Sequence, residues 1–157
     1  MKPTVYIETS VISYLTARPS RDLVVAAHQQ LTLDWWDLAM PQLDGYISPI
    51  VLEEISKGDQ NAAAKRLAAV DQFEILELMP EVQVLADLYF DAIELPEKAR
   101  ADAYHLAIAV QHGMDYLVTW NCVHIAGARV KRILEVINHG RNLQTPIFCT
   151  PEELMEI

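Results

Sequence analysis

The feature that most constrains the fold is a regular alternation of short β-branched runs with longer segments of helical periodicity. The short runs predict strands at residues 5–7, 46–48, 73–76, 116–119 and 147–149. Apolar residues at helical spacing predict helices at residues 21–39, 49–56, 61–70, 80–93, 99–112 and 129–138, with a last short one at 150–153. Because strands separated by helices pair in parallel, we expect an α/β fold whose mainly parallel sheet is covered on both faces.

Local signals place several helix ends. Ser20 is the expected N-cap of helix 21–39, and Asp59 is the expected N-cap of helix 61–70. Gly58 and Gly113 are expected to end the helices that precede them. In the helix that Pro80 opens, the spacing predicts an inward face made of Val84, Leu85, Leu88 and Ile93.

Length and composition favour one globular domain over residues 1–157, since the chain has 157 residues of which 52% are apolar. No apolar run approaches the roughly 20 residues of a membrane helix, and Glu8 interrupts the N-terminus before a signal peptide could form. Cys122 and Cys149 form neither a metal-type spacing nor a disulfide framework, so a reduced, cytoplasmic location is expected.

The net charge of −10 restricts the way in which the chain can bind nucleic acid. A protein this acidic does not hold RNA or DNA through its overall field. The charge still allows a local basic rim, a basic protein partner, or an acidic pocket whose sign is inverted by divalent cations.

Acidic and hydroxyl side chains follow the predicted strands. Glu8 and Ser10 come after the first strand, Glu53 and Glu54 lie a helical turn after the second, and Thr119 ends the fourth. The helix before the fourth strand carries Asp102 near its start, and Asn121 follows that strand. Ligands of parallel sheets bind at the carboxyl ends of the strands, so these groups are expected to converge there. Converging carboxylates repel one another, and a hard cation such as Mg²⁺ or Mn²⁺ removes the conflict.

Such a cation also defines a chemistry. It lowers the pKa of a bound water and stabilises the charge that develops on a phosphodiester. The residues alone therefore indicate metal-assisted phosphoryl chemistry. The plainer alternative is that Glu8 and Asp102 are ordinary acids at a strand end and a helix N-terminus, where negative charge is favourable without any ligand.

Four segments in this order and spacing resemble a PIN domain: residues 5–11 (VYIETSV), 47–55 (ISPIVLEEI), 95–109 (LPEKARADAYHLAIA) and 115–121 (DYLVTWN). The resemblance extends from residue 5 to about residue 150. It implies an α/β/α sandwich with a central parallel sheet, and a Mg²⁺- or Mn²⁺-dependent endoribonuclease. It also implies the toxin half of a VapBC-type toxin–antitoxin pair, neutralised by a small antitoxin protein and often dimeric.

The resemblance assigns the acidic positions one by one. Glu8 stands at the first, where Asp is usual, and Asp102 stands at the third. Glu54 matches the second in preference to Glu53, because an apolar residue follows it and it lies six residues after Ser48.

The fourth acidic position is occupied by Asn121, which lowers the charge of the set from −4 to −3. Ser10 and Thr119 stand where short hydroxyl side chains support the first and fourth acids. The departures at Glu8 and Asn121 leave room for an altered metal preference, or for a PIN-like module that binds RNA or protein with weakened catalysis.

Several residues near these positions have two interpretations. Asn121 serves as a ligand or as a helix N-cap, and His105 either orients Asp102 or is a packed core histidine. His124 contacts substrate or lies on the surface, and Trp120 stacks on a base or packs.

Candidate contacts for RNA phosphates are Arg18 after the first strand and the basic cluster of Arg129, Lys131 and Arg132. An ordinary solvated helix face is the alternative for each of them. The apolar stretch 23–38 is a candidate antitoxin groove or dimer face, although one side of it must also cover the sheet.

Overall fold

Five parallel strands form the central sheet, with the first strand in its middle. The computed structural model describes residues 1–157. The strands are β1 (Thr4–Ile7), β2 (Asp44–Ile47), β3 (Glu74–Ile75), β4 (Tyr116–Val118) and β5 (Ile147–Cys149). They are arranged in the order β3-β2-β1-β4-β5, and every neighbouring pair is parallel. The sheet expected from the alternating pattern is confirmed, with strand boundaries that differ by one or two residues.

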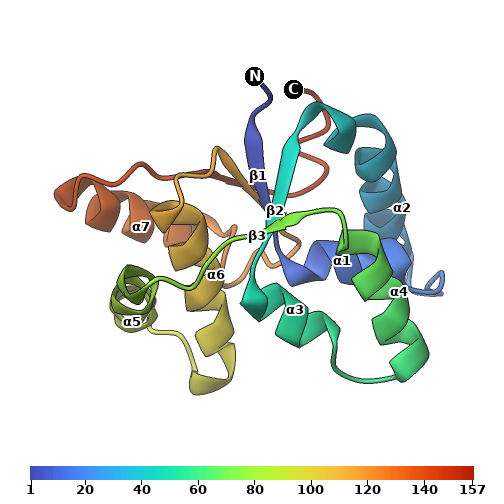
Figure 1. Cartoon of the computed structure of the whole chain (residues 1–157), viewed down its shortest axis with the longest axis horizontal. Helices are drawn as coiled ribbons and strands as arrows, with labels where there is room; N and C mark the ends of the chain where they lie inside the picture. The colour runs from blue at the N-terminus through green and yellow to red at the C-terminus, as the bar shows by residue number, and fades with distance from the viewer.

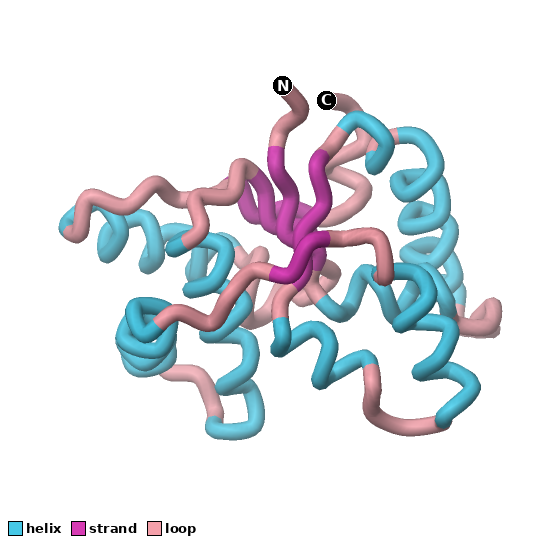
Figure 2. Tube along the Cα trace, in the orientation of Figure 1, coloured by secondary structure: helices cyan, strands magenta, loops and turns pink.

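Helices cover the sheet in two layers. The first four are α1 (Thr9–Thr16), α2 (Leu23–Leu38), α3 (Pro49–Ile55) and α4 (Gln60–Val70). The later three are α5 (Pro80–Ile93), α6 (Arg100–Gln111) and α7 (Ala128–Gly140), with short 3₁₀ turns η1 (Met40–Gln42) and η2 (Glu97–Ala99). α1, α2 and α4 lie on one side of the sheet, and α5, α6 and α7 lie on the other (Figures 1 and 2). This is the predicted α/β/α sandwich. None of the helices is both long enough and apolar enough to cross a membrane.

The core explains why the middle of the sheet reads as an uninterrupted apolar run. Val5, Tyr6 and Ile7 of β1 are completely buried, because helices cover both faces of this strand. Most of α6 after its first turn is buried as well, including a histidine: Ala103, His105, Leu106, Ala107, Ile108, Ala109 and Val110. A buried polar side chain on such a helix requires partners, and those of His105 lie at the functional site.

The structure corrects three local predictions. Asp22 caps α2 through a hydrogen bond to the Val25 amide, so Ser20 is not the N-cap. The inward face of α5 is shifted from the predicted one, since Val84 is 59% and Leu88 36% exposed. The buried positions of α5 repeat at three and four residues: Val82, Leu85, Ala86, Tyr89 and Ile93. Residues 150–153 form a turn instead of a helix.

The strand order places one end of the sheet at a topological switch point. From β1 the chain first moves outward through β2 and β3, and then returns to the other side of β1 as β4 and β5. The loops after β1 and β4 therefore leave the sheet next to each other and diverge, which opens a crevice at their carboxyl ends. Glu8 directly follows β1, and Thr119 directly follows β4.

Candidate metal centre

Glu8 is held in the crevice by two hydroxyl groups. Its side chain is only 5% exposed, and its Oε1 accepts hydrogen bonds from Ser10 Oγ at 2.5 Å and from Thr119 Oγ1 at 2.6 Å. These donors are fixed in turn by backbone amides, because the Trp120 amide donates to Ser10 Oγ and the Asn121 amide donates to Thr119 Oγ1. The carboxylate thus has one orientation, set by the paired ends of β1 and β4.

Glu54 reaches the same crevice from the last turn of α3. Its Oε1 accepts hydrogen bonds from Thr9 Oγ1 and from His105 Nε2, both at 2.6 Å. The neighbouring Glu53 instead points to solvent, where its 69% exposed side chain lies 3.7 Å from Lys57 Nζ. The two glutamates therefore lie in different environments, and Glu54 is the one beside Glu8.

His105 joins Glu54 to the core. Its Nδ1 lies 2.6 Å from the Tyr6 hydroxyl, which lies 2.7 Å from Ser48 Oγ. Since an ionised Glu54 can only accept, the proton between it and His105 belongs to Nε2. Of the two interpretations of His105, a packed core histidine and a partner of Asp102, the structure bears out the first, since the residue is fully buried and its hydrogen bonds go to Glu54 and Tyr6.

The charges of His105 and Glu54 stabilise each other. Burial works against a charge on His105, but the hydrogen bond to Glu54 and the nearby carboxylates outweigh it and raise the pKa of His105. Those carboxylates are Glu8, Glu54 and Asp102, so all three acids act on one imidazole. Burial also opposes the charge of Glu54, yet the hydrogen bonds from His105 and Thr9 lower its pKa. Burial raises the pKa of the Tyr6 hydroxyl well above its usual value.

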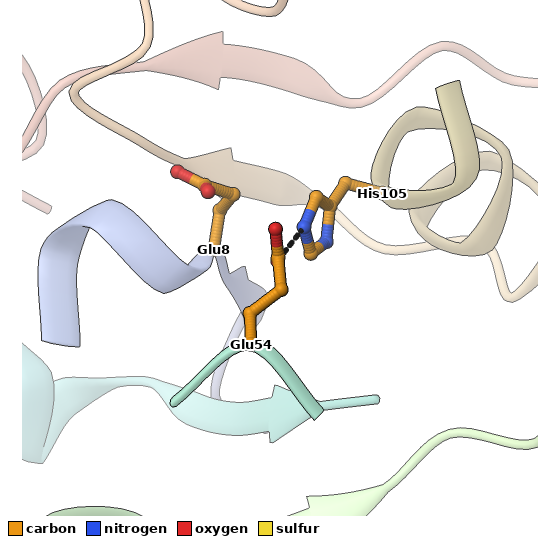
Figure 3. Close-up of side chains that lie close together, drawn as sticks. All are labelled: Glu8, Glu54 and His105. Carbon is orange, nitrogen blue, oxygen red and sulfur yellow. Dashed lines mark hydrogen bonds and ion pairs between the residues drawn. The ribbon is translucent and has the colours of Figure 1, made fainter. Parts of the chain in front are cut away.

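Figure 3 shows Glu8, Glu54 and His105 converging from the start of α1, from α3 and from α6. One potential ligand atom from each of these three side chains lies within 4.8 Å of the other two. His105 already uses both ring nitrogens within the protein, so the carboxylates are the groups with remaining capacity to bind a cation.

Asp102 is not part of the group formed by Glu8, Glu54 and His105, and it forms a second cluster with Asn121 and His124. Its Oδ2 accepts from Asn121 Nδ2 at 3.2 Å and lies 3.0 Å from His124 Nδ1. Asn121 Oδ1 accepts the His124 backbone amide at 3.0 Å, which fixes the amide group with its nitrogen toward Asp102. Asn121 is therefore a cap of the turn that follows β4, and it is also a donor to the third acid.

The carboxylates share a pattern that fits a hard divalent cation. In Glu8, Glu54 and Asp102, one oxygen accepts two hydrogen bonds, and the other accepts none from the protein. The only buried side-chain nitrogen or oxygen without a partner is Trp35 Nε1, so the three free oxygens are open to solvent. Oxygen ligands with retained waters are what Mg²⁺ and Mn²⁺ prefer, and the donor set therefore fits either ion.

The residues expected to contact RNA lie in two places. Arg129 Nη1 donates to the Ile93 carbonyl at 2.9 Å, and Arg132 lines a surface hollow together with Ala92 of α5. This part of α7, which also carries Lys131, packs toward the end of α5. Arg18 is exposed just after α1. None of the four donates to a carboxylate of the crevice.

Sequence reasoning missed the role of Tyr6, which reads as one more apolar residue of a central strand. The available signal was its hydroxyl, because a tyrosine buried in the middle of a sheet requires a hydrogen-bond partner. Trp120 was left between packing and base stacking. His28 covers one of its faces, with ring centroids 4.1 Å apart and planes inclined by 13°, and its Nε1 donates to Thr32 Oγ1.

Fold and site together define an α/β protein with a cluster of carboxylates and a histidine at the switch point of a parallel sheet. The family model of the PIN domain matches residues 5–121, and the chain belongs to the PIN domain family. A search of curated proteins gave no significant match. Among solved structures, a chain of the VapBC2 complex from Rickettsia felis, crystallised with a DNA fragment of its promoter, is similar with a TM-score of 0.57 and 14% identity. The match covers 94% of this chain and 96% of that one, so the folds agree over nearly their whole length.

Proposed function

We propose that the protein is a divalent-metal-dependent endoribonuclease whose Mg²⁺ or Mn²⁺ is held by Glu8, Glu54 and Asp102. The observation that carries this proposal is the shared pattern of the three carboxylates, each with one oxygen fixed by protein donors and one free. Membership of the PIN domain family supports the reaction class. When bound, the ion supplies Lewis-acid stabilisation of the phosphodiester transition state and lowers the pKa of water.

The chain's own residues keep the ligands in position. Ser10 and Thr119 donate to Glu8, while Thr9 and His105 donate to Glu54, so both carboxylates keep their orientation before any ion arrives. Such partners of metal ligands commonly matter by a factor of about 10–100 in affinity or activity. Asn121 donates to Asp102 and leaves the site with three negative charges instead of four.

The biological role that we propose is that of the toxin in a VapBC-type toxin–antitoxin module. The solved relative belongs to a VapBC complex and matches this chain over nearly its full length. In this proposal residues 1–157 form one cytoplasmic PIN domain that is inhibited by an antitoxin protein and forms a homodimer. The partner is tested by co-expression with the product of a short adjacent reading frame. Growth inhibition that this product does not relieve would contradict the proposed role.

RNA cleavage tests the site directly. Purified protein is incubated with single-stranded RNA in Mn²⁺ or Mg²⁺ and, separately, in EDTA. We expect cleavage with the metals, none in EDTA, and loss of cleavage in Asp102→Asn and Glu54→Gln. Glu53→Gln is the matched control, because it removes the same charge one residue away on the solvent side. Cleavage that is unchanged in Asp102→Asn and Glu54→Gln would reject the site.

A second candidate is a PIN-like binding module with weakened catalysis, and the observation that favours it is the neutral Asn121 beside Asp102. Thermal unfolding in Mn²⁺ separates the two. An ion present at 100 times its Kd stabilises the folded state by about 2.7 kcal/mol, which raises the Tm by about 5–10 °C for a chain of this size. A binding module without a metal site shows no such shift. Small phosphate esters assayed beside RNA test the remaining alternative, a metal-dependent phosphatase.

A further inference from the structure

A groove of about 470 Å³ lies between α1 and α4, outside the metal centre. Its walls are largely polar and include Ser13 and Thr16 from α1, Arg18 just after α1, and Lys65 and Arg66 from α4. α1 and α4 pack against each other, and they lie side by side in Figure 1. Apart from Arg18, a candidate contact for RNA phosphates, no residue of this groove has been given a function so far.

The groove is basic in a strongly acidic protein. The chain has 12 Lys and Arg against 22 Asp and Glu, yet three cations and one acid line the groove. None of the three cations forms an ion pair with a carboxylate. The acid, Asp59, is occupied as the N-cap of α4, where it accepts the Ala62 amide at 2.9 Å. The local field of the groove therefore favours an anion.

The groove also offers hydrogen-bond donors. Ser13 Oγ makes no side-chain hydrogen bond within the protein, whereas the Thr16 hydroxyl donates to the Ile12 carbonyl. Arg66 is held by the Ile55 and Lys57 carbonyls, at 2.9 Å and 2.6 Å, through Nε and Nη2. These bonds leave its Nη1 free, so the guanidinium is both oriented and able to donate.

Both walls are connected to the metal centre. On α1, Thr9 donates to Glu54, and Ser13 lies four residues further on the same face, a rise of about 6 Å. On α4, Arg66 binds the carbonyls of Ile55 and Lys57, which come just after Glu54. A polymer bound with one phosphate at the metal centre can therefore continue along α1 into the groove.

The geometry points to a binding site for the backbone phosphates of single-stranded RNA next to the cleavage position. This inference rests on the proposed ribonuclease function and deepens it. The chemistry matches phosphate, since two arginines, a lysine and a free hydroxyl bind charged oxygens, and no aromatic ring lines the groove for base stacking. Binding here is therefore independent of base sequence.

The test compares two doubly substituted proteins in binding to a short single-stranded RNA. Arg18→Ala with Lys65→Ala removes two cations of the groove, and Arg66 is left in place because it holds the loop after α3. Lys2→Ala with Arg141→Ala is the matched control. It removes the same charge near the opposite end of the sheet, since Lys2 precedes β1 and Arg141 follows α7. Binding is measured in EDTA, so that no RNA is cut, at several salt concentrations.

Each phosphate contact with a single strand contributes about 0.7 to the slope of log affinity against log salt. The groove variant is therefore expected to bind about 25-fold more weakly at 0.1 M salt, with a slope smaller by about 1.4. The control keeps the slope of the unsubstituted chain. In that chain, RNA should shift the amide resonances of Ser13, Ala17 and Ala62.

The outcomes separate this inference from the proposed function. Equal RNA affinity and slope in the groove variant and the control, or no shift at Ser13 and Ala62, overturns the groove even if RNA is cleaved. Groove-dependent RNA binding without cleavage in Mn²⁺ supports the groove and overturns the ribonuclease. If an acidic peptide shifts the groove resonances and RNA does not, the groove binds a protein partner. That result would likewise overturn the proposed RNA-binding role of the groove.

Discussion

The two halves of the crevice are built in different ways. The half around Glu8 and Glu54 has its donors on α1, directly after β4 and on α6, and its central imidazole is completely buried. The half around Asp102 depends on one turn after β4, and its His124 side chain is 28% exposed, whereas the His105 side chain of the first half is fully buried. The first half is continuous with the buried core through His105, whereas the second half lies in a turn at the surface of that core.

Because of this difference, we expect substitutions in the two halves to affect folding stability and metal affinity to different extents. Changing His105 in the first half leaves the buried Tyr6 hydroxyl with one partner fewer, so both folding and metal binding are affected. Substitutions in the second half affect groups that solvent already reaches, so we expect them to change metal affinity more than folding stability. The predictions below test this separation.

The largest effect is expected for Glu8→Gln. The amide oxygen of Gln can still accept from Ser10 and Thr119, so the fold is kept while one negative ligand is lost. Losing several kcal/mol of charge stabilisation lowers kcat/KM for RNA cleavage by about 10³-fold. Steady-state kinetics measure the change, and circular dichroism checks that the variant folds. Activity within tenfold of the unsubstituted protein would remove Glu8 from the site.

Replacing His105 is expected to affect both stability and metal binding. His105→Ala leaves the buried Tyr6 hydroxyl without this partner, and Glu54 loses one of its two donors, which costs about 1–3 kcal/mol of unfolding free energy. Mn²⁺ affinity should fall about 10–100-fold, since Glu54 is no longer oriented. Urea denaturation and Mn²⁺ titration measure the two effects. His124→Ala, which removes an imidazole from the other half, is the control.

The pairing of His105 with Glu54 predicts a pH profile for the stability of the metal-free protein. The pKa of His105 is raised, so its contribution is complete below about pH 6.5 and is lost as pH rises through the raised pKa. The pKa of Glu54 is lowered, so its contribution is complete above about pH 4.5 and is lost as pH falls through the lowered pKa. The stability difference between the unsubstituted chain and His105→Ala should therefore be greatest between these limits. A difference that is constant from pH 4 to pH 9 would contradict an ionic pair.

Restoring the fourth acid should strengthen metal binding. In Asn121→Asp the new carboxylate keeps the cap on His124 but lies against Asp102, so the metal-free protein unfolds more easily. The added charge attracts the cation, and Mn²⁺ affinity should rise about tenfold. Calorimetric titration measures the affinity. Equal affinity in both proteins would show that position 121 lies outside the reach of the ion.

The smallest effect is expected for His124→Ala. It removes one hydrogen bond from a partly exposed pair, which is worth about 0.5–1.5 kcal/mol. Cleavage should fall by about two- to tenfold while the Tm stays within a few degrees. A loss of cleavage as large as that in Glu8→Gln would show that both halves contribute equally to activity, and would contradict the distinction between them.

The fold was predictable because its signals are local. The buried run of β1 and the helical spacing of the longer segments define the parallel sheet without any knowledge of contacts. The prediction of the inward face of α5 was wrong because local signals do not distinguish its apolar residues. Val84 and Val82 are equally apolar, and only the packing of α5 against α6 and α7 decides which side is buried.

The candidate site was predictable by position but not by its connections. The rule that polar residues after strands converge predicted a cluster of Glu8, Glu54 and Asn121, to which Asp102 was added from the helix before the fourth strand. The structure groups Glu8 and Glu54 with His105, and it groups Asp102 with Asn121 and His124. The rule could not pair His105 with Glu54, because a spacing of three along α6 favours Asp102 as the partner. Nor could it find the α1–α4 groove beyond Arg18, since Lys65 and Arg66 follow no strand and are brought there only by helix packing.

The central place of β1 has a consequence for biosynthesis. The bond from Thr119 to Glu8 joins positions 111 residues apart, and β1 is paired on one side by a strand that emerges late from the ribosome. Contacts of such long range form only after the intervening chain is available. A nascent polypeptide that still lacks β4 thus carries Glu8 and Glu54 without the hydroxyl and amide groups that complete the cleft. The proposed centre is therefore incomplete until β4 and the residues that follow it have been made.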